Sequence, residues 1–242
     1  MMLPSKRRLI VFSSFSQDTI INGQGVKIEI KPGGPALFIR NALDTVSIPF
    51  SLSTGKVIDV EILLKSEGEF GRIQKLPNKH FCSLPMSNWI IVSTILDEWQ
   101  FDDPLPARLF VDLQGYVRDG SDFGAKRPNE NINRLAGKIF CLKGTKEEIS
   151  YLSNDAIARQ KKQILLITDA ANGVELYNKG RYTYLPVNKI NRLTDSIGAG
   201  DTFFAYFVAS MFIGTTPTNA ARYAINQTYQ FLSKEQIKEM PS

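Results

Sequence analysis

Histidine and cysteine are almost absent from this chain, which has one His and two Cys among 242 residues. Cys82 and Cys141 lie far apart in apolar surroundings and form no Cys-x-x-Cys pair, so we expect buried thiols in a reducing compartment. His80 has no nearby cysteine or ladder of carboxylates, and no pattern supports a Ser-His-Asp triad. The composition therefore disfavours disulfide scaffolds, zinc modules and histidine-based hydrolases.

Long hydrophobic runs are missing as well. The apolar run 9–12 is too short for a signal peptide, and nothing approaches the length of a membrane span. We therefore expect a cytoplasmic protein with no membrane partner. The chain has no Gly-x-x-x-x-Gly-Lys-Ser/Thr, which excludes a P-loop, and no Gly-x-Gly-x-x-Gly after an early strand, which disfavours a dinucleotide fold.

Charge of one sign is not concentrated anywhere, although the net charge is +5 and the pI is about 9.1. The densest basic cluster, 6–8, is predicted to be a solvated lead-in to the first strand. A basic balance is typical of proteins that bind nucleic acid or an anionic substrate. Because no basic stripe alternates with aromatics, we expect no nucleic-acid partner and a small-molecule substrate instead.

Short apolar segments alternate with helical ones along most of the chain. The predicted buried strands are 8–13, 89–93, 108–112, 138–142 and 163–168, followed by a hairpin of 174–177 and 182–186. The predicted helices are 36–43, 145–152, 155–162, 199–212 and 217–231. Such alternation is typical of a parallel sheet covered by helices on both faces.

Three segments, 26–30, 57–64 and 70–74, have a different pattern, in which apolar and polar residues alternate. They predict an antiparallel patch with one face in water. The segment Pro32-Gly33-Gly34-Pro35 is expected to end the first of these strands. We expect one domain, 1–242, consisting of a large α/β body and a small β lid from about 18–32 and 57–76.

The segment Asp195-Ser-Ile-Gly-Ala-Gly-Asp201 carries the most chemical information. Its glycines let backbone amides crowd together where a helix begins, and the helix dipole favours an anion there. A carboxylate on that first turn can accept a proton from an alcohol. An anion cradle beside a base is what phosphoryl transfer to a hydroxyl requires. The alternative is a turn with an Asp cap, which is common.

The segment 194–207 closely resembles the C-terminal signature of the ribokinase/PfkB carbohydrate kinase family. Three further segments resemble family motifs in family order, namely 14–18, Gly33-Gly34-Pro35-Ala36-Leu37 and 168–173. The resemblance implies a ribokinase-like three-layer αβα fold with a mostly parallel central sheet and a small β lid. It also implies an enzyme that uses ATP and Mg²⁺ to phosphorylate a hydroxyl of a sugar, and a homodimer paired through the lid.

The resemblance assigns roles to the glycine-rich segment. Asp201 would be the general base, and the amides of Gly198, Ala199 and Gly200 would form the anion hole. In several relatives the residue at the position of Asp195 helps to hold a monovalent cation such as K⁺. The alternative for Asp195 is a residue that caps the turn.

Substrate-binding roles follow from the N-terminal motifs. Asp18, in the turn after the first strand, would hold paired sugar hydroxyls, unless it is a surface turn residue. Gly33 and Gly34 would let the backbone approach the substrate, or would only end a strand. Phe38 departs from the family, which often has a sugar-contacting Asn there. A Phe would stack on a ring or pack in the core, so the identity of the sugar stays open.

Two further segments resemble the family less closely. Asp112 ends a buried strand, where α/β proteins bind ligands, and is expected to line the substrate cleft. Arg118, in the same 112–118 pattern, is a weaker candidate. Glu147 matches the acidic residue of an Asn-x-x-Glu motif that organises magnesium-bound water, but Gly144 replaces the Asn. The alternative for Glu147 is an ordinary acidic first helical turn.

The nucleotide site is predicted from Thr168 and Gly173 in the 168–173 segment and from Asn226, on a helix expected to flank the adenine. The alternative for Asn226 is a helix that only packs on the body. Two other functions stay open: a nucleoside kinase of the same family, for which Phe38 offers a stacking surface, and a non-catalytic nucleotide-binding relative.

Overall fold

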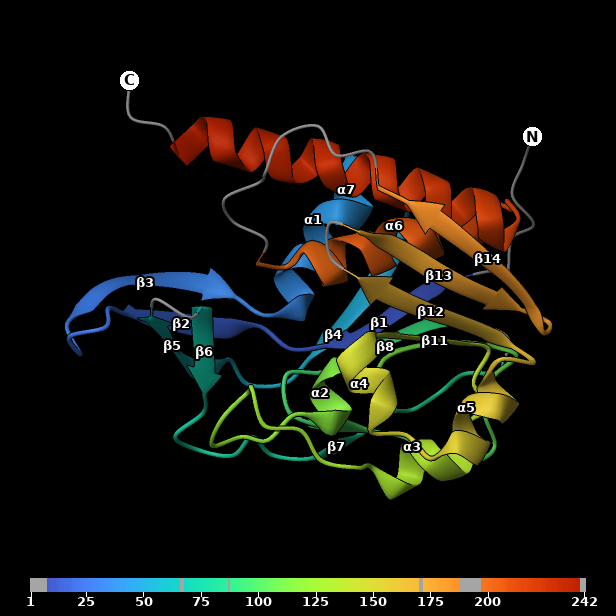
Figure 1. Ribbon diagram of the computed structural model, residues 1–242, viewed down its shortest axis with the longest axis horizontal. Coiled ribbons are helices and arrows are strands. Elements are labelled where there is room, and N and C mark those ends of the chain that lie inside the picture. Colours follow the sequence, from blue (N-terminus) through green and yellow to red (C-terminus); the bar gives the residue numbers. More distant parts are fainter. Residues whose placement is uncertain (1–7, 66–67, 87, 170–171, 188–196, 240–242) are drawn as a thin grey trace.

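The computed structural model describes residues 8–65, 68–86, 88–169, 172–187 and 197–239. Its main element is an eight-stranded sheet in the order β14-β13-β12-β11-β10-β8-β1-β4 (Figure 1). Adjacent strands are parallel from β4 to β12, and β13 and β14 are antiparallel. The bounds of these strands are Leu9–Ser13 (β1), Phe50–Thr54 (β4), Trp89–Ser93 (β8), Arg108–Asp112 (β10), Cys141–Thr145 (β11), Ile164–Asp169 (β12), Gly173–Asn178 (β13) and Arg181–Pro186 (β14).

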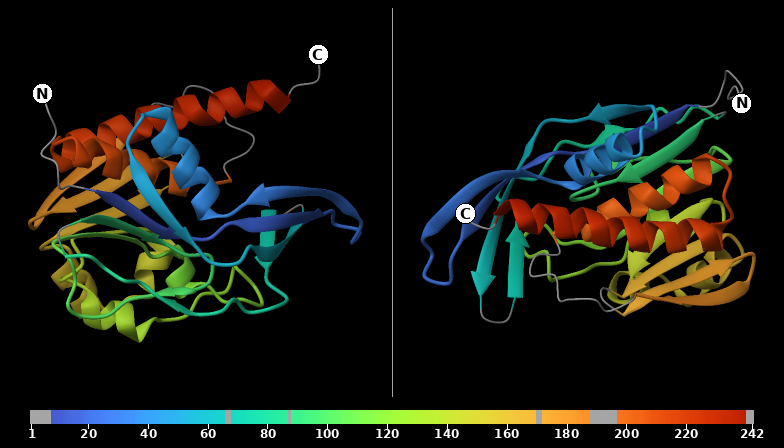
Figure 2. Two further views of the ribbon diagram at one scale, coloured as in Figure 1. Left: turned by 180° about the vertical axis from the view of Figure 1, so that it is seen from behind. Right: turned by 90° about the horizontal axis from the view of Figure 1, so that it is seen from above.

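Helices cover both faces of this sheet, as the fold prediction required (Figures 1 and 2). On one face the core cluster includes residues of α1, α6 and α7. On the other face it includes residues of α2, α3, α4 and α5. The central strands are apolar along their length because both of their faces are buried. The bounds of the helices are Pro35–Thr45 (α1), Gln114–Val117 (α2), Glu130–Leu135 (α3), Lys146–Ser150 (α4), Asn154–Gln160 (α5), Ala199–Phe212 (α6) and Pro217–Glu239 (α7).

Helix α6 is the most deeply buried helix of the described chain. Every residue from Asp201 to Phe212 is buried, because the helix lies between the sheet and α7 and also contacts α1. A helix that is apolar on all sides belongs in a core. The position of α6 carries the polar residues of its first turn into the interior.

A second sheet extends from one end of the body, in the order β3-β2-β5-β6 (Figure 2). The prediction of a purely antiparallel patch was wrong, because β2 and β5 are parallel while the outer pairs are antiparallel. Asp18 was also misplaced, since it lies within β2 and not in a turn. The chain passes almost directly from β1 into this sheet. The bounds of the strands are Ser16–Ile21 (β2), Lys27–Gly33 (β3), Ile58–Lys65 (β5) and Gly68–Arg72 (β6).

Several predicted boundaries were wrong. β3 continues through Pro32 to Gly33, since a proline costs little on an edge strand. β11 begins at Cys141 and not at 138, because its pairing with β10 begins at Cys141. The strand then continues beyond the predicted end, through Lys143 and Gly144 to Thr145. No element was predicted at β2, β4, α2 or α3, or at the short strands His80–Phe81 (β7) and Trp99–Gln100 (β9).

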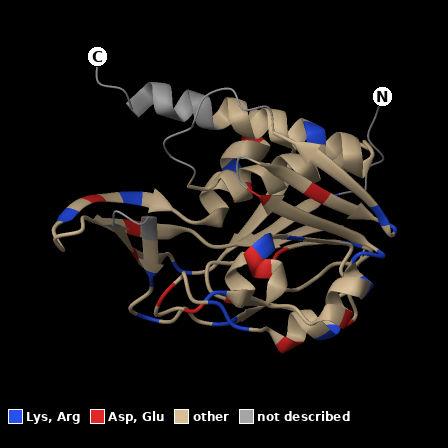
Figure 3. Cartoon of the chain, in the orientation of Figure 1, with Lys and Arg blue, Asp and Glu red and all other residues tan. Residues whose placement is uncertain are grey.

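Charged residues of both signs are dispersed over the described elements, and Lys and Arg are interspersed with Asp and Glu (Figure 3). Within the described chain, no helix combines the length and apolar character needed to cross a bilayer.

Candidate active site

A row of polar side chains lies across four adjacent strands at the carboxyl end of the sheet. It consists of Ser13 on β1, Ser93 on β8, Asp112 on β10 and Lys143 on β11. The register pairs Ser13 with Ser93 and Asp112 with Lys143, and the β8–β10 register brings Ser93 beside Asp112. Since alternate residues of a strand share a face, all four lie on the face that α6 covers.

Asp201 lies above this row on the first turn of α6. The helix begins after Gly198, whose φ of 74° is left-handed. The Asp201 carboxylate accepts a hydrogen bond from Ser93 Oγ at 3.2 Å. Burial, and then the charge of Asp112, raise the pKa of Asp201 to about 7, and Lys143 opposes the rise. The group therefore exchanges its proton near neutral pH, as a general base does.

Lys143 and Asp112 form a buried ion pair. Lys143 Nζ lies 2.8 Å from Asp112 Oδ2, with 3% and 0% of the two side chains exposed. Asp112 Oδ1 also accepts a hydrogen bond from the amide of Gln114. Burial lowers the pKa of Lys143, but the nearby carboxylates of Asp112, Glu148 and Asp201 outweigh burial and raise it. Lys143 therefore keeps its charge, and the Asp112 carboxylate is held by protein groups.

Two glycines of the α6 N-terminus are in close contact with side chains. A Cβ on Gly198 would lie 2.3 Å from the Phe38 ring, and a Cβ on Gly200 would lie 2.8 Å from Lys143 Nζ. Phe38 thus packs directly against the segment predicted to be the anion hole. The amides of the first helical turn have no partner within the helix, and such an N-terminus is a place where anions can bind.

Gly33 and Gly34 lie beside Asp18, the carboxylate predicted to bind the acceptor, which forms the second half of the candidate site. A Cβ on Gly33 would lie 2.0 Å from Asp18 Oδ2, and a Cβ on Gly34 would lie 2.7 Å from the Ser14 carbonyl. Asp18 is 5% exposed and accepts a hydrogen bond from Ser16 Oγ. Burial raises the pKa of Asp18, against the effects of Ser16, Lys31 and Arg118. The glycines therefore leave room for this carboxylate beside the start of α1.

Arg118, a weaker candidate in the sequence, interacts electrostatically with both halves of the site. Its charge acts on Asp18 and on Asp201. The guanidinium lies over the Phe123 ring at 4.1 Å and donates to the Ile95 carbonyl. Burial lowers the pKa of Arg118. Its Nε is buried without a hydrogen-bond partner in the described chain, which leaves one donor for a ligand.

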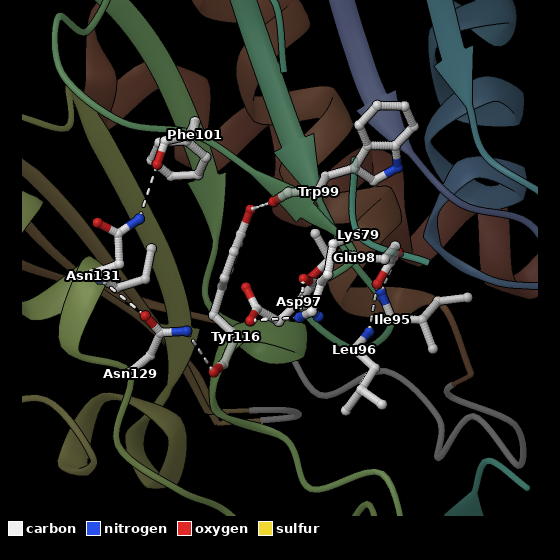
Figure 4. Close-up of polar contacts among 12 residues, drawn as sticks. Lys79, Ile95, Leu96, Asp97, Glu98, Trp99, Phe101, Tyr116, Asn129 and Asn131 are labelled. Carbon is white, nitrogen blue, oxygen red and sulfur yellow. Dashed lines mark hydrogen bonds and ion pairs between the residues drawn. The ribbon is translucent and has the colours of Figure 1, made fainter. Parts of the chain in front are cut away.

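A polar network beside α2 positions the segment that leads to Arg118 (Figure 4). The Glu98 carboxylate accepts hydrogen bonds from the amides of Ile95 and Leu96. The Tyr116 hydroxyl donates to the Trp99 carbonyl. Asn129 and Asn131 then donate to the carbonyls of Tyr116 and Phe101. Because these buried polar groups are paired, α2 is fixed against the loop whose Ile95 carbonyl binds Arg118.

The predicted magnesium residue, Glu147, is exposed on the first turn of α4. Its neighbour Glu148 is the buried one, and it forms a capping box with Thr145. Among the described residues, no group of three His, Cys, Asp or Glu side chains is placed to hold a metal ion. Mg²⁺ often binds through one or two carboxylates, water and substrate phosphates, and an exposed carboxylate such as Glu147 is of the chemical type that this binding uses.

Three of the remaining predicted residues, Thr168, Gly173 and Asn226, are not members of the polar row. Thr168 Oγ1 lies 3.5 Å from the Gly144 carbonyl. Gly173 begins β13, with a φ of 148° and no room for a Cβ beside β14. Asn226 is exposed on α7, and Asp195 lies outside the described residues.

Three residues of the cluster were not predicted: Ser13, Ser93 and Lys143. Lys143 could have been predicted, because a lysine inside a short, otherwise uncharged strand needs a buried partner. Ser13 and Ser93 could not have been predicted, because a serine at the end of a strand is common.

The fold is shared with solved structures of the ribokinase type. A pyrophosphate-dependent kinase in the ribokinase family, complexed with a pyrophosphate analog and myo-inositol, aligns with a TM-score of 0.66 and 17% identity, over 92% of this chain and 93% of that one. The Arabidopsis thaliana ribokinase complexed with ribose and ATP aligns with a TM-score of 0.64 and 16% identity, over 91% of each chain. The predicted ribokinase-like α/β fold is thereby confirmed.

Sequence comparisons agree with the fold. The model of the pfkB family carbohydrate kinases matches residues 115–227. A fructokinase from Rhizobium leguminosarum bv. trifolii is 29% identical over 105 residues, which are 40% of this chain and 30% of the fructokinase. Together with the shared fold, these matches support the resemblance to the ribokinase/PfkB family over part of the chain.

Proposed function

We propose that the protein is an ATP-dependent small-molecule kinase that transfers the γ-phosphoryl group to a hydroxyl of a sugar or sugar-like substrate. The observation that carries the proposal is Asp201, a buried carboxylate on the first turn of α6 with a pKa raised to about 7. The base and the free amides of a helix N-terminus thus lie within one turn of each other. Phosphoryl transfer depends on this combination of positioning and electrostatics.

The proposed reaction begins when the acceptor hydroxyl, oriented by Asp18, gives its proton to Asp201. Its oxygen forms a bond to the transferred phosphorus, and the bond from that phosphorus to the leaving oxygen breaks. The products are the phosphate ester, ADP and the proton on Asp201. The amides of Ala199 and Gly200 would stabilise the negative charge on the transferred group. Bound Mg²⁺, held through water by Glu147, would neutralise charge on the donor phosphates. Asp195 keeps the proposed role of binding a monovalent cation.

The small sheet is proposed to be the lid of a single domain, 1–242. Support comes from Asp18, which lies on β2 of that sheet and responds to the charge of Arg118 in the body. Thr168, Gly173 and Asn226 are proposed for the nucleotide. The two free thiols, Cys82 and Cys141, are buried, and they support the cytoplasm as the compartment.

A pyrophosphate donor is a second candidate. One neighbour in fold is a pyrophosphate-dependent kinase, and Lys143 and Arg118 bring two cations close to Asp201. A dense positive charge suits a donor that consists only of phosphates. The products would then be the phosphate ester and inorganic phosphate. A nucleoside acceptor is a third candidate, favoured by the Phe38 ring beside Gly198.

A matrix of donors and acceptors tests the proposal. We expect the purified protein to phosphorylate at least one sugar or polyol with ATP, measured as coupled ADP release over sugars, sugar acids, polyols and nucleosides. Pyrophosphate is tested in parallel by phosphate-ester formation. Asp18→Asn is expected to raise the KM for the acceptor by about tenfold or more, because a hydrogen bond to a charged group is lost. Binding of donor without transfer to any acceptor would support the non-catalytic alternative and contradict the proposal.

The homodimer implied by the family is proposed to form through the outer face of the small sheet. Ile28 and Ile30 are 58% and 47% exposed on β3, next to Val26 at 56%. We expect light scattering on a sizing column to give twice the mass of one chain, and Ile28→Lys/Ile30→Lys to give the mass of one. Ile213→Lys, at a 63% exposed position after α6, is the control. A wild-type monomer at micromolar concentration would contradict the dimer.

A further inference from the structure

Lys143 is an unusual residue for its place in the fold. It lies in the middle of β11, between Leu142 and Gly144, and its side chain is 3% exposed. In the described part of the chain its ammonium donates one hydrogen bond, to Asp112. An ammonium has three N–H donors. Two donors are therefore left on a charge that is buried beneath the first turn of α6.

The surroundings of Lys143 direct this charge towards Gly200. A Cβ on Gly200 would lie 2.8 Å from Nζ and 3.7 Å from Cε, so the end of the side chain touches the helix backbone there. Asp112, Glu148 and Asp201 are the carboxylates that act on it. The ammonium thus lies beside the same amides that are proposed to hold the phosphoryl group.

Stability alone does not account for this pair. A buried ion pair loses the hydration of both charges, and well-packed apolar residues in its place are often as stable or more so. The nearest pair of the ladder on the same face, Phe110 and Cys141, is buried and apolar. The Lys143–Asp112 pair therefore needs a reason other than folding.

We propose that Lys143 is a further catalytic residue, whose ammonium contacts the oxygens of the transferred phosphoryl group beside Gly200. The proposal rests on the kinase function. In the reaction, Lys143 keeps its protons and supplies a fixed positive charge as negative charge develops on the transferred group. Asp112 holds the ammonium in place and keeps it charged, and so acts as a positioning residue.

Kinetics of two Lys143 variants test the proposal. Lys143→Met is expected to lower kcat by about 10²–10³-fold, the usual effect of removing one donor to a developing anion. Lys143→Arg is expected to recover part of this loss, because the charge returns in a different shape. Lys138→Met is the control, since Lys138 is an exposed lysine paired with Asp103. A kcat within about threefold of the wild type for Lys143→Met would overturn the proposal.

The pH dependence of kcat gives a second readout. For the wild type we expect kcat to rise with pH through about 7, the pKa of Asp201, because the base must be ionised. Asp112 raises that pKa, while Lys143, Ser93 and Arg118 lower it. Lys143→Met is therefore expected to move the rise to higher pH. An unchanged pH profile would contradict a role for the Lys143 charge beside the base.

Binding of inorganic pyrophosphate and of ATP, measured by calorimetry, tests Lys143 without requiring catalysis. Lys143→Met is expected to weaken binding of at least one of them by about tenfold or more, and Lys138→Met to leave both unchanged. Loss of anion binding in a protein that transfers no phosphoryl group would support the Lys143 site and contradict the kinase. If the wild type transfers a phosphoryl group but Lys143→Met binds both anions as tightly as the wild type, the result would support the kinase and contradict the Lys143 site.

A double variant separates catalysis from folding. Lys143→Met alone leaves Asp112 unpaired and is expected to lower Tm, whereas Lys143→Met/Asp112→Asn removes both charges and should regain much of that loss. The double variant is still expected to have a much lower kcat than Asp112→Asn alone. If the double variant and Asp112→Asn have equal kcat, Lys143 has only a structural role.

Discussion

Asp201→Asn is expected to lower kcat by at least about 10²–10⁴-fold while leaving the affinity for the acceptor nearly unchanged. The asparagine has the same shape but cannot accept the proton of the hydroxyl, and a positioned general base contributes about this factor. Asp201 sits on α6 with Ser93 as its hydrogen-bond donor, so the change leaves the packing intact. Steady-state rates and acceptor titration by calorimetry measure the two effects separately.

The same variant is expected to be more stable than the wild type above neutral pH. The pKa of Asp201 is raised in the folded protein from 3.8 to about 7. Between these values the unfolded chain releases a proton that the folded chain retains, so the wild type loses stability as pH rises through this window. The asparagine side chain of the variant does not titrate. The difference in Tm between variant and wild type should therefore be larger at pH 8 than at pH 4.

Asp44→Asn is the matched control, because Asp44 is an exposed carboxylate on α1. It is expected to leave kcat unchanged. Near-normal turnover in Asp201→Asn would exclude Asp201 as the base. A Tm difference that is independent of pH would contradict the burial of a carboxylate with a raised pKa.

Gly198→Ala is expected to lower both stability and turnover. Gly198 has a φ of 74° and is in contact with Phe38, whose ring lies 2.3 Å from the position of an added Cβ. A left-handed φ costs a non-glycine residue about 1–2 kcal/mol, and an overpacked contact adds about 1–3 kcal/mol. A Tm loss of several degrees follows, at about 2–4 °C per kcal/mol for a chain of this size.

Turnover should fall by about tenfold or more, since relief of the clash moves the first turn of α6 and the amides that it presents. A matched control is available in Gly180→Ala, which has a φ of 78° with no atom within 4 Å of the added Cβ. Gly180→Ala has only the backbone cost of the left-handed φ. Its Tm should therefore fall less than that of Gly198→Ala, and its activity should be unchanged. Phe38→Ala in the Gly198→Ala background should restore part of the stability. Equal effects of the two alanines would show that the Phe38 contact is unimportant.

Much of the fold could be predicted from local pattern. The buried strands β8, β10 and β12 are continuous apolar segments, and α6 begins where Gly-Ala-Gly predicts a helix start. The small sheet was harder to predict. Its alternating pattern shows which residues face water, but the parallel pairing of β2 with β5 depends on the path of the chain between them.

At the candidate site, the residue types and the glycine-rich motif around Asp201 could be predicted from the sequence, because helix starts and glycine-rich turns are local. Which of these groups meet depends on the folded arrangement of the strands. Strand register brings Ser93, Asp112 and Lys143 into one row, and the burial of α6 carries Asp201 against them. A lysine and an aspartate that are 31 residues apart leave no periodic signal, since their pairing depends on parallel strands joined by a long connection. The raised pKa of Asp201 likewise depends on burial and on charges from other strands, which exist only once the chain is folded.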